Sequence, residues 1–371
     1  MNSIRRVLIV QPYGLGDALF TTPLLRALRT LPSVESVDLL LGSRTEAIFR
    51  NNPHAGQIFT LDKDRWHSLG RRELLREIFF WWKKLRGRYD LLIDLSLQRE
   101  TAFYSGVFLG IPRRIGFNFK HRGTFLTQSI SLPRGFEGRS VVEFYAELGR
   151  LVGLEIEEPF LEFYVSEEDR QRAWEIHRPA DESYLAVAPG GGESWGKDAH
   201  FKRWPACYFA QALLEFRKRV NFGSVVILGS KGERSLGEAM EQTLASDSGN
   251  PPDFKVINLC GEVSLGVAAA ILEGARLLLA NDGGLVHLAH ALHVPLVALF
   301  GPADPKVYGP FPAYPRAVPV MRRDLPCRPC YSNFRYNSAC VDRECLTELP
   351  PEAVKVFLDR KNFWKNCVNG R

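Results

Sequence analysis

A length of 371 residues exceeds what one ordinary hydrophobic core organises, so the sequence predicts two domains. The formal net charge of +6 favours an anionic partner but is too small to indicate nucleic-acid binding, which we do not expect. No apolar run reaches the ~18 residues that a membrane span needs, and the N-terminus lacks a secretory pattern. We therefore expect a cytoplasmic chain that works, at most, at the surface of a membrane.

The first predicted strand, residues 7–10, runs into a glycine turn and then an amphipathic helix. This order is typical of a doubly wound α/β domain, where ligands bind at the carboxyl ends of parallel strands. Asp17 follows that strand and could take part in chemistry; the alternative is that it only caps the helix. Gly14 and Gly16 allow the backbone to approach a ligand. Position 19 is Leu rather than the glycine of a dinucleotide fingerprint, so NAD binding is not predicted.

Residues 71–86 predict a basic amphipathic helix. The side expected to face the sheet carries Leu74, Leu75, Ile78, Trp82 and Leu85. Phe80 and Trp81 fall outside that side, next to cationic residues, an arrangement suited to a membrane interface. The alternative is ordinary packing of the two rings under a neighbouring loop.

Residues 113–122 hold five basic side chains, among them Arg114, Lys120 and Arg122, in what we expect to be a loop. Such a cluster is usually a solvated face. Because it lies in the same predicted domain as Asp17, it could instead bind acidic sugars or phosphates. Both interpretations remain open from the sequence.

A break in the pattern near residues 157–182 predicts the domain boundary, after which a strand over 184–188 starts the second half. It leads into a glycine-rich stretch that includes Ser194, whose backbone amides could bind phosphate oxygens. Lys202 follows and could reach a phosphate. Glu233, after the next strand, could accept hydrogen bonds from a ribose; the alternative is a first-turn glutamate favoured by the helix dipole.

Another predicted strand, residues 277–280, precedes Asp282 and two glycines at the start of a helix. The backbone amides of such a helix start form an anion site. His287 and His290 share a face of that helix. The pair alone is weak evidence for a metal, and we do not predict one there.

Several of these stretches resemble the motifs of glycosyltransferase family 9, the family of the ADP-heptose:lipopolysaccharide heptosyltransferases. The C-terminal signature is matched by residues 281–289 and 295–305, the lysine–Trp–Pro motif by 202–205, and the N-terminal motif by 14–23. The motifs occur in the expected order and span most of the chain.

The resemblance implies an α/β GT-B fold, with two Rossmann-like doubly wound domains facing across a cleft. Residues 1–165 would form an N-terminal acceptor-binding domain and residues 180–345 a C-terminal nucleotide-sugar-binding domain. Residues 346–371 would form a C-terminal helix that crosses back toward the N-terminal domain.

The same resemblance implies an inverting transfer in which Asp17 is the general base for an acceptor hydroxyl. Lys202 would neutralise charge on the diphosphate leaving group. The donor-binding residues would be Lys202, Glu233, Asp282, Gly283, Gly284, His287 and Ser194. The acceptor side is assigned to Gly14, Gly16, Arg114, Lys120 and Arg122. Many members carry Ser or Thr where Gly283 stands, so a hydroxyl contact is missing here.

The resemblance also implies catalysis without a cofactor or bound metal, and we interpret Asp62 and Asp64 as part of a solvated loop rather than a metal chelate. Four cysteines, spaced as Cys-x2-Cys-x9-Cys-x4-Cys, nevertheless suggest a structural zinc site. An iron–sulfur cluster and four reduced thiols are the alternatives. These cysteines are Cys327, Cys330, Cys340 and Cys345.

The expected function is transfer of a sugar, heptose from ADP-heptose, to a lipopolysaccharide inner-core acceptor. We expect an anionic glycolipid acceptor and a peripheral position at the inner face of the cytoplasmic membrane. One alternative is a family 9 transferase that uses another nucleotide sugar for O-antigen or a related surface glycan. A second alternative is a non-catalytic glycolipid-binding protein.

Overall fold

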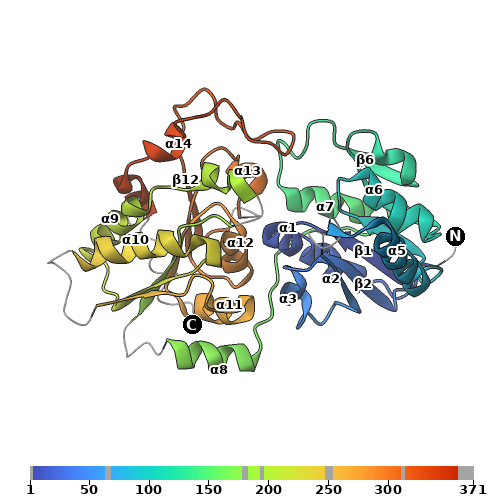
Figure 1. The fold of residues 1–371 in the computed structure, drawn as a ribbon, viewed down its shortest axis with the longest axis horizontal. Coiled ribbons are helices and arrows are strands. Elements are labelled where there is room, and N and C mark those ends of the chain that lie inside the picture. The colour runs from blue at the N-terminus through green and yellow to red at the C-terminus, as the bar shows by residue number, and fades with distance from the viewer. Residues whose placement is uncertain are drawn as a thin grey trace. The chain divides into compact units, whose positions relative to one another are not determined.

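A computed structural model describes residues 3–62, 68–177, 183–192, 196–246, 254–310 and 314–357. The chain divides into two compact units, Met1–Tyr164 and Val165–Arg371. Each unit is built around one six-stranded sheet in which all neighbouring strands are parallel (Figure 1). The predicted α/β class, with two doubly wound parallel sheets, is confirmed.

The sheet of the first unit has the order β3-β2-β1-β4-β5-β6. The side chains of residues 7–10 in the central strand are 0% exposed, which explains their uninterrupted apolar run. Strand order reverses between β1 and β4, which pair in the register Val7↔Leu91. The strands are β1 (Arg6–Gln11), β2 (Ser36–Gly42), β3 (Ile58–Leu61), β4 (Leu91–Asp94), β5 (Arg113–Asn118) and β6 (Gln128–Ser131).

Helices of the first unit connect these strands. Ser140 caps the last of them through a hydrogen bond that its side chain accepts from the Val142 amide. The helices are α1 (Leu15–Phe20), α2 (Thr22–Leu28), α3 (Glu46–Phe49), α5 (Arg71–Leu85), α6 (Arg99–Ala102), the π-helix η1 (Phe103–Phe108), the 3-10 helix η2 (Arg122–Phe125) and α7 (Val141–Arg150).

The second unit repeats the same topology, with the order β12-β11-β10-β7-β8-β9. Its chain order reverses between β7 and β10, the equivalents of β1 and β4, which pair in the register Leu277↔Leu185. Every residue of both strands is buried. The strands are β7 (Tyr184–Ala188), β8 (Ser224–Ile227), β9 (Lys255–Asn258), β10 (Leu277–Asn281), β11 (Leu296–Leu299) and β12 (Ala317–Val320).

Helices of the second unit flank its sheet, and α8 packs against α11 (Figure 1). The Arg170 guanidinium on α8 contacts the Glu273 carboxylate on α11 at 2.7 Å. The helices are α8 (Glu167–Ile176), η3 (Gly196–Lys202), α9 (Ala206–Arg217), η4 (Lys231–Glu233), α10 (Arg234–Ala245), α11 (Leu265–Gly274), α12 (Gly284–Ala291), α13 (Pro305–Tyr308), α14 (Glu344–Thr347) and η5 (Pro351–Phe357).

The C-terminal segment differs in detail from the predicted terminal helix. Instead of one helix, α14 and the 3-10 helix η5 occupy its described part, and η5 packs against α9 and β12 within the second unit. Residues 358–371, where the predicted crossing would occur, lie outside the described residues. Among the described helices, none combines the length and the apolar character needed to cross a membrane.

Candidate functional site

Asp17 lies at the point of the first sheet where strand order reverses. In doubly wound sheets this switch point, at the carboxyl ends of the strands, is where ligands bind. β1 ends at Gln11, and Asp17 is the third residue of α1, with Gly14 at the N-cap position. The alternative prediction, that Asp17 is itself the capping residue, is therefore wrong. The side chain is instead a first-turn acid, which the positive end of the helix dipole favours as a carboxylate.

Tyr13 connects the Asp17 loop to the neighbouring strand. Its hydroxyl accepts a hydrogen bond at 2.8 Å from the amide of Leu97, which follows β4. Burial, assisted by the nearby charges of Asp17 and Asp94, raises the pKa of Tyr13 to about 12. Tyr13 is therefore a neutral phenol within electrostatic reach of Asp17 and ties together the two strand ends that form the switch point.

Arg122 and Asp94 form an ion pair beneath this loop, and both side chains are 0% exposed. The Arg122 guanidinium also donates to the carbonyl oxygens of Ser96 and Phe117. The Asp94 carboxylate accepts a hydrogen bond from the Ser96 amide at 2.9 Å. The two terminal nitrogens of Arg122 are engaged inside the unit, whereas its buried Nε atom has no hydrogen-bond partner among the described residues. Because the side chain is 0% exposed, we assign Arg122 a structural role in this unit, and its acceptor contact stays a prediction.

Arg114 also differs from the expected solvated loop, because Arg113–Asn118 is strand β5. The Arg114 guanidinium donates to the carbonyl oxygens of Phe125 at 2.8 Å and Ile111 at 2.7 Å, which pins the turn around η2. Lys120 is exposed, and its ammonium lies 5.0 Å from the centroid of the Phe119 ring. Of these three predicted cations, Lys120 is exposed, Arg114 is half-buried and Arg122 is buried.

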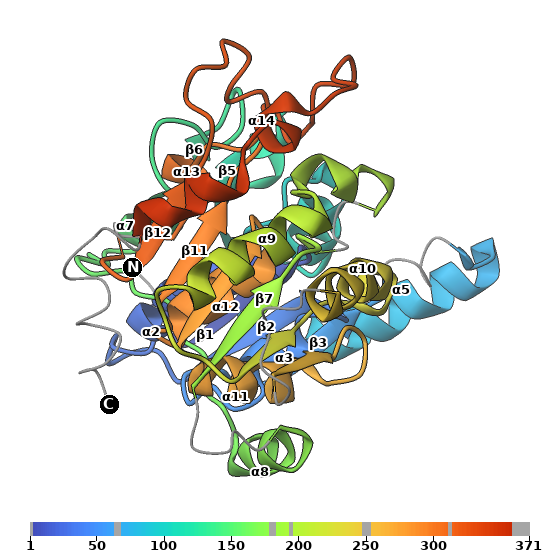
Figure 2. The same cartoon turned by 90° about the vertical axis from the view of Figure 1, so that its left-hand side faces the viewer.

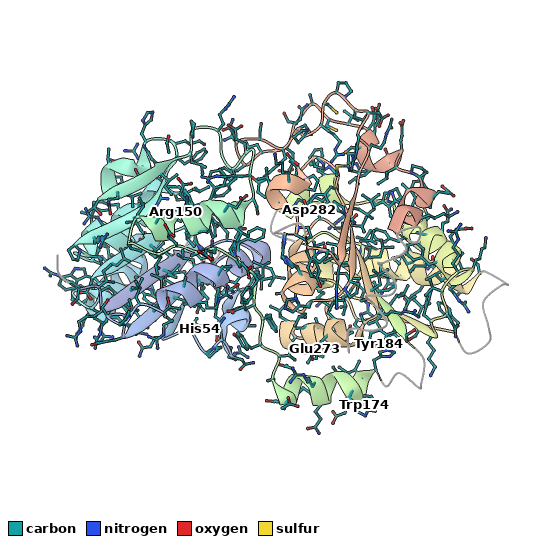
Figure 3. The ribbon with its side chains drawn as sticks, turned by 180° about the vertical axis from the view of Figure 1, so that it is seen from behind. His54, Arg150, Trp174, Tyr184, Glu273 and Asp282 are labelled. Carbon is teal, nitrogen blue, oxygen red and sulfur yellow. The ribbon has the colours of Figure 1, made fainter. Side chains whose placement is uncertain are left out.

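In the second unit, Lys202 and Asp282 meet at the equivalent switch point. Lys202 is the last residue of η3, and Asp282 directly follows β10 (Figure 3). The Lys202 Nζ atom lies 2.8 Å from the Asp282 Oδ2 atom, with side chains 13% and 4% exposed. The structure therefore brings together two residues that stand 80 positions apart in the sequence and were both predicted to bind the donor.

Asn281 organises this switch point, and sequence reasoning missed it. Its side-chain amide donates to the Pro189 carbonyl at 2.6 Å, and its Oδ1 atom accepts from the Trp204 amide at 3.1 Å. Asn281 thereby ties the loop after β7 and the Trp-Pro motif to the end of β10. Asn281 could have been found from its position at the end of a buried strand, directly before the carboxylate of Asp282.

Gly283 and Gly191 approach one another closely. A Cβ atom on Gly283 would lie 2.6 Å from the Gly191 carbonyl oxygen, a backbone atom that cannot move aside alone. In this chain the contact leaves no room for a side chain at position 283. Gly284 then begins α12, whose first-turn amides and dipole favour a bound anion.

His287 lies in the first half of α12 and is buried. Burial, and secondarily the charge of Lys202, lowers the pKa of His287 to about 3. His290 has a pKa lowered to about 3 by burial, assisted by His287 and His293. Both imidazoles are therefore neutral at neutral pH, and neither adds positive charge to the switch point.

Glu233 joins the loops that follow β7 and β8. Its Oε1 atom accepts a hydrogen bond from the Gly192 amide, and its Oε2 atom accepts one from the Ser230 amide, both at 2.8 Å. A Cβ atom on Gly190 would lie 1.9 Å from the Glu233 carboxyl carbon, so this approach requires glycine. Ser194, the remaining predicted donor contact, lies outside the described residues.

Residues 78–338 match the family model described as glycosyltransferase family 9 (heptosyltransferase). The chain belongs to glycosyltransferase family 9. The predicted resemblance is confirmed, and this family 9 chain is a glycosyltransferase. The match covers the switch point of the second unit entirely and begins, in the first unit, within α5.

Curated relatives cover most of this glycosyltransferase. Lipooligosaccharide heptosyltransferase 2 of Haemophilus ducreyi is 26% identical over 313 residues, covering 82% of this chain and 86% of that protein. Lipopolysaccharide heptosyltransferase 1 of Pseudomonas aeruginosa is 26% identical over 380 residues, which cover 95% of this chain and 97% of that protein. The structure of E. coli ADP-heptose lps heptosyltransferase II shares the fold, with a TM-score of 0.69 and 20% identity. The match covers 94% of this chain and 96% of that protein.

The four C-terminal cysteines of this glycosyltransferase are free thiols. Burial raises the pKa of Cys345 to about 11, and burial also raises the pKa of Cys330. Within the described part of the chain, no group of three or more His, Cys, Asp or Glu side chains is placed to hold a metal ion. This arrangement of Cys327, Cys330, Cys340 and Cys345 lends no support to a zinc site, which stays a prediction.

Asp64 lies outside the described residues, and Asp62 is exposed.

Proposed function

We propose that this family 9 glycosyltransferase transfers heptose from ADP-heptose to an anionic lipopolysaccharide inner-core acceptor at the inner face of the cytoplasmic membrane. The observation that carries the proposal is the Lys202–Asp282 ion pair, buried at the switch point where α12 begins. The curated relatives from H. ducreyi and P. aeruginosa are named as heptosyltransferases of lipooligosaccharide and lipopolysaccharide. An E. coli heptosyltransferase of the same fold is described with ADP.

In the proposed reaction Asp17 accepts the proton of an acceptor hydroxyl while that oxygen attacks the anomeric carbon of the donor. The bond from the anomeric carbon to the diphosphate oxygen breaks in the same displacement, which inverts the anomeric centre. The electron pair leaves with ADP, whose additional negative charge is stabilised by the Lys202 ammonium and the first amides of α12. Asp282 holds the Lys202 ammonium in place through their ion pair.

The mechanism is tested with Asp17→Asn and Lys202→Ala, assayed for turnover and for ADP binding by calorimetry. Asp17→Asn should lower kcat by a factor of ~10² to 10⁴ and leave ADP affinity unchanged, because a general base acts on the acceptor alone. Lys202→Ala should weaken ADP binding as well as turnover. Asp62→Asn, an exposed acid of the same unit, is the matched control and should keep normal turnover. Near-normal turnover of Asp17→Asn would refute the assignment.

The donor is tested by thermal shift with ADP, ADP-heptose, UDP and GDP. A ligand present at 100 times its Kd stabilises the folded state by about 2.7 kcal/mol, which such an assay detects. We expect ADP and ADP-heptose to shift the midpoint and the other nucleotides to leave it unchanged. A shift with UDP or GDP instead would assign the chain to another nucleotide sugar.

A further inference from the structure

An exposed apolar surface lies on the first unit, on α5 and η1. Among the residues that the structure describes, eleven large apolar side chains are exposed, and seven of them come from these two elements. Leu75, Phe79 and Phe80 on α5 are the most exposed of the seven, at 66%, 61% and 54%. The other four, on η1, are Phe103, Tyr104, Val107 and Phe108. We call these seven residues the α5–η1 face.

The two halves of this face form one continuous surface. The rings of Trp82 and Phe108 bring α5 and η1 into contact, with centroids 6.4 Å apart. Phe79 stacks on Trp82 at 5.7 Å, and Tyr104 contacts Phe108 at 6.1 Å. An unbroken series of ring contacts therefore runs from α5 to η1. Contiguous exposed apolar surface of this kind marks an interaction site.

The beginning of α5 projects away from the sheet, whereas its end is anchored there. Leu85, the last residue, is 1% exposed and belongs to a core cluster with Leu8 and Val10. Leu75, ten residues earlier, is largely exposed, and Figure 2 shows the helix extending outward from the first unit. The prediction that Leu75 faces the sheet is therefore wrong, and Trp81, predicted to be left over, packs against the core instead.

Cations flank the α5 part of the apolar face. Residues 71–88 contain seven Lys or Arg and two Glu, a net charge of +5. The Lys84 ammonium lies 5.5 Å from the Phe80 ring centroid, and the Arg86 guanidinium lies 4.5 Å from that of Trp82. Apolar and aromatic side chains interleaved with cations match a bilayer interface, where rings insert at headgroup depth and cations meet lipid phosphates.

We propose that the α5–η1 face docks this protein onto an anionic lipid bilayer, with Leu75, Phe79 and Phe80 inserted at the headgroup level. The inference rests on the proposed function, because its acceptor is a glycolipid. A second copy of the chain is a poorer occupant: a symmetric contact would set +5 against +5.

Co-sedimentation with vesicles of phosphatidylethanolamine and phosphatidylglycerol tests the proposal, with pure phosphatidylcholine vesicles for comparison. The wild-type protein should bind the anionic vesicles, bind phosphatidylcholine weakly, and lose binding as salt rises. Phe79→Ser/Phe80→Ser should weaken binding roughly tenfold or more, since each buried ring contributes about 150–250 Å² of contact. Leu75→Ser, which removes no ring stacking, is a second variant and should weaken binding in the same direction.

Trp174→Ser is the matched control, because Trp174 is a 56% exposed aromatic on α8 of the second unit (Figure 3). It should leave vesicle binding unchanged. Absence of wild-type binding to anionic vesicles, or equal binding by the Phe79→Ser/Phe80→Ser variant, would overturn the proposal. So would light scattering that shows a wild-type dimer converted to monomer by that variant, because the face would then be an interface between copies.

The failure of this inference is separable from failure of the proposed function. With a deacylated, soluble acceptor, the variants of the α5–η1 face should retain wild-type kcat while losing vesicle binding. A wild-type protein that transfers sugar normally but does not bind vesicles would refute the docking surface and leave the proposed reaction intact. A wild-type protein that binds vesicles but transfers no sugar would refute the proposed function and leave the docking surface intact.

Discussion

Arg122→Met should destabilise the first unit severely, because it leaves the Asp94 carboxylate buried without its counter-charge. Both side chains are 0% exposed, so water cannot compensate for the lost guanidinium. Removing one partner of such a pair typically costs about 3–5 kcal/mol. For a unit of this size each kcal/mol lowers the midpoint by roughly 2–4 °C, so we expect a fall in Tm of about 6–20 °C.

Urea denaturation followed by circular dichroism measures this loss, and a second substitution identifies its cause. Asp94→Asn/Arg122→Met removes the stranded charge but keeps an oxygen that can accept from the Ser96 amide. The double variant should therefore be more stable than Arg122→Met alone, by about 2 kcal/mol. Lys120→Met, a neighbouring exposed cation, should change stability by less than about 0.5 kcal/mol.

The pH dependence of the same variant gives an independent check. Burial raises the pKa of Asp94, and the Arg122 guanidinium opposes that rise. Without Arg122 the pKa rises further, so the folded state takes up a proton that the unfolded state does not, and Arg122→Met should regain stability as the pH falls. A loss under about 1 kcal/mol at pH 8, or a double variant no more stable than the single one, would refute this reasoning.

Two further predictions concern the second unit. Gly283→Thr should destabilise it by about 1–3 kcal/mol and weaken ADP binding, since the added Cβ meets the Gly191 carbonyl; calorimetry that finds normal affinity would contradict the contact. Acidification should also destabilise the fold through His287, whose folded pKa of about 3 lies below the unfolded value of ~6.5. The unfolded state then binds the extra proton, so about 2 kcal/mol of the free energy of unfolding is lost between pH 7.5 and pH 5. His287→Gln should lose less stability over the same range, as measured by the urea midpoint at each pH.

The sequence predicted the fold well because buried parallel strands leave a strong signal. The apolar runs that became β1 and β7 are buried along almost their whole length, and glycines or carboxylates follow them at the switch points. Those features depend on local sequence, which is why Asp17 and Asp282 could be located beforehand. The resemblance to family 9 rested on the same short motifs.

The direction of long side chains could not be predicted in this way. Arg114 and Arg122 occur in a cationic run that has the same composition whether its side chains are solvated or buried. Their fate depends on acceptors brought in by the fold: Asp94 is 28 residues from Arg122 and reaches it only because β4 pairs with β5. Leu75 shows the converse, since the apolar pattern of α5 continues beyond the point at which the helix leaves the sheet.

Glu233 illustrates why a predicted binding residue can also be structural. Its two oxygens already accept hydrogen bonds from Gly192 and Ser230, so it fixes the loops after β7 and β8 before any ligand arrives. Glu233 is only 2% exposed, so the structure supports the loop-fixing role, and its ribose contact stays a prediction. Glu233→Ala would remove the two loop contacts together with any contact to ribose. A loss of donor affinity in that variant would report on loop geometry as much as on a ribose contact, whereas Asp17 and Lys202 allow a cleaner separation of chemistry from scaffold.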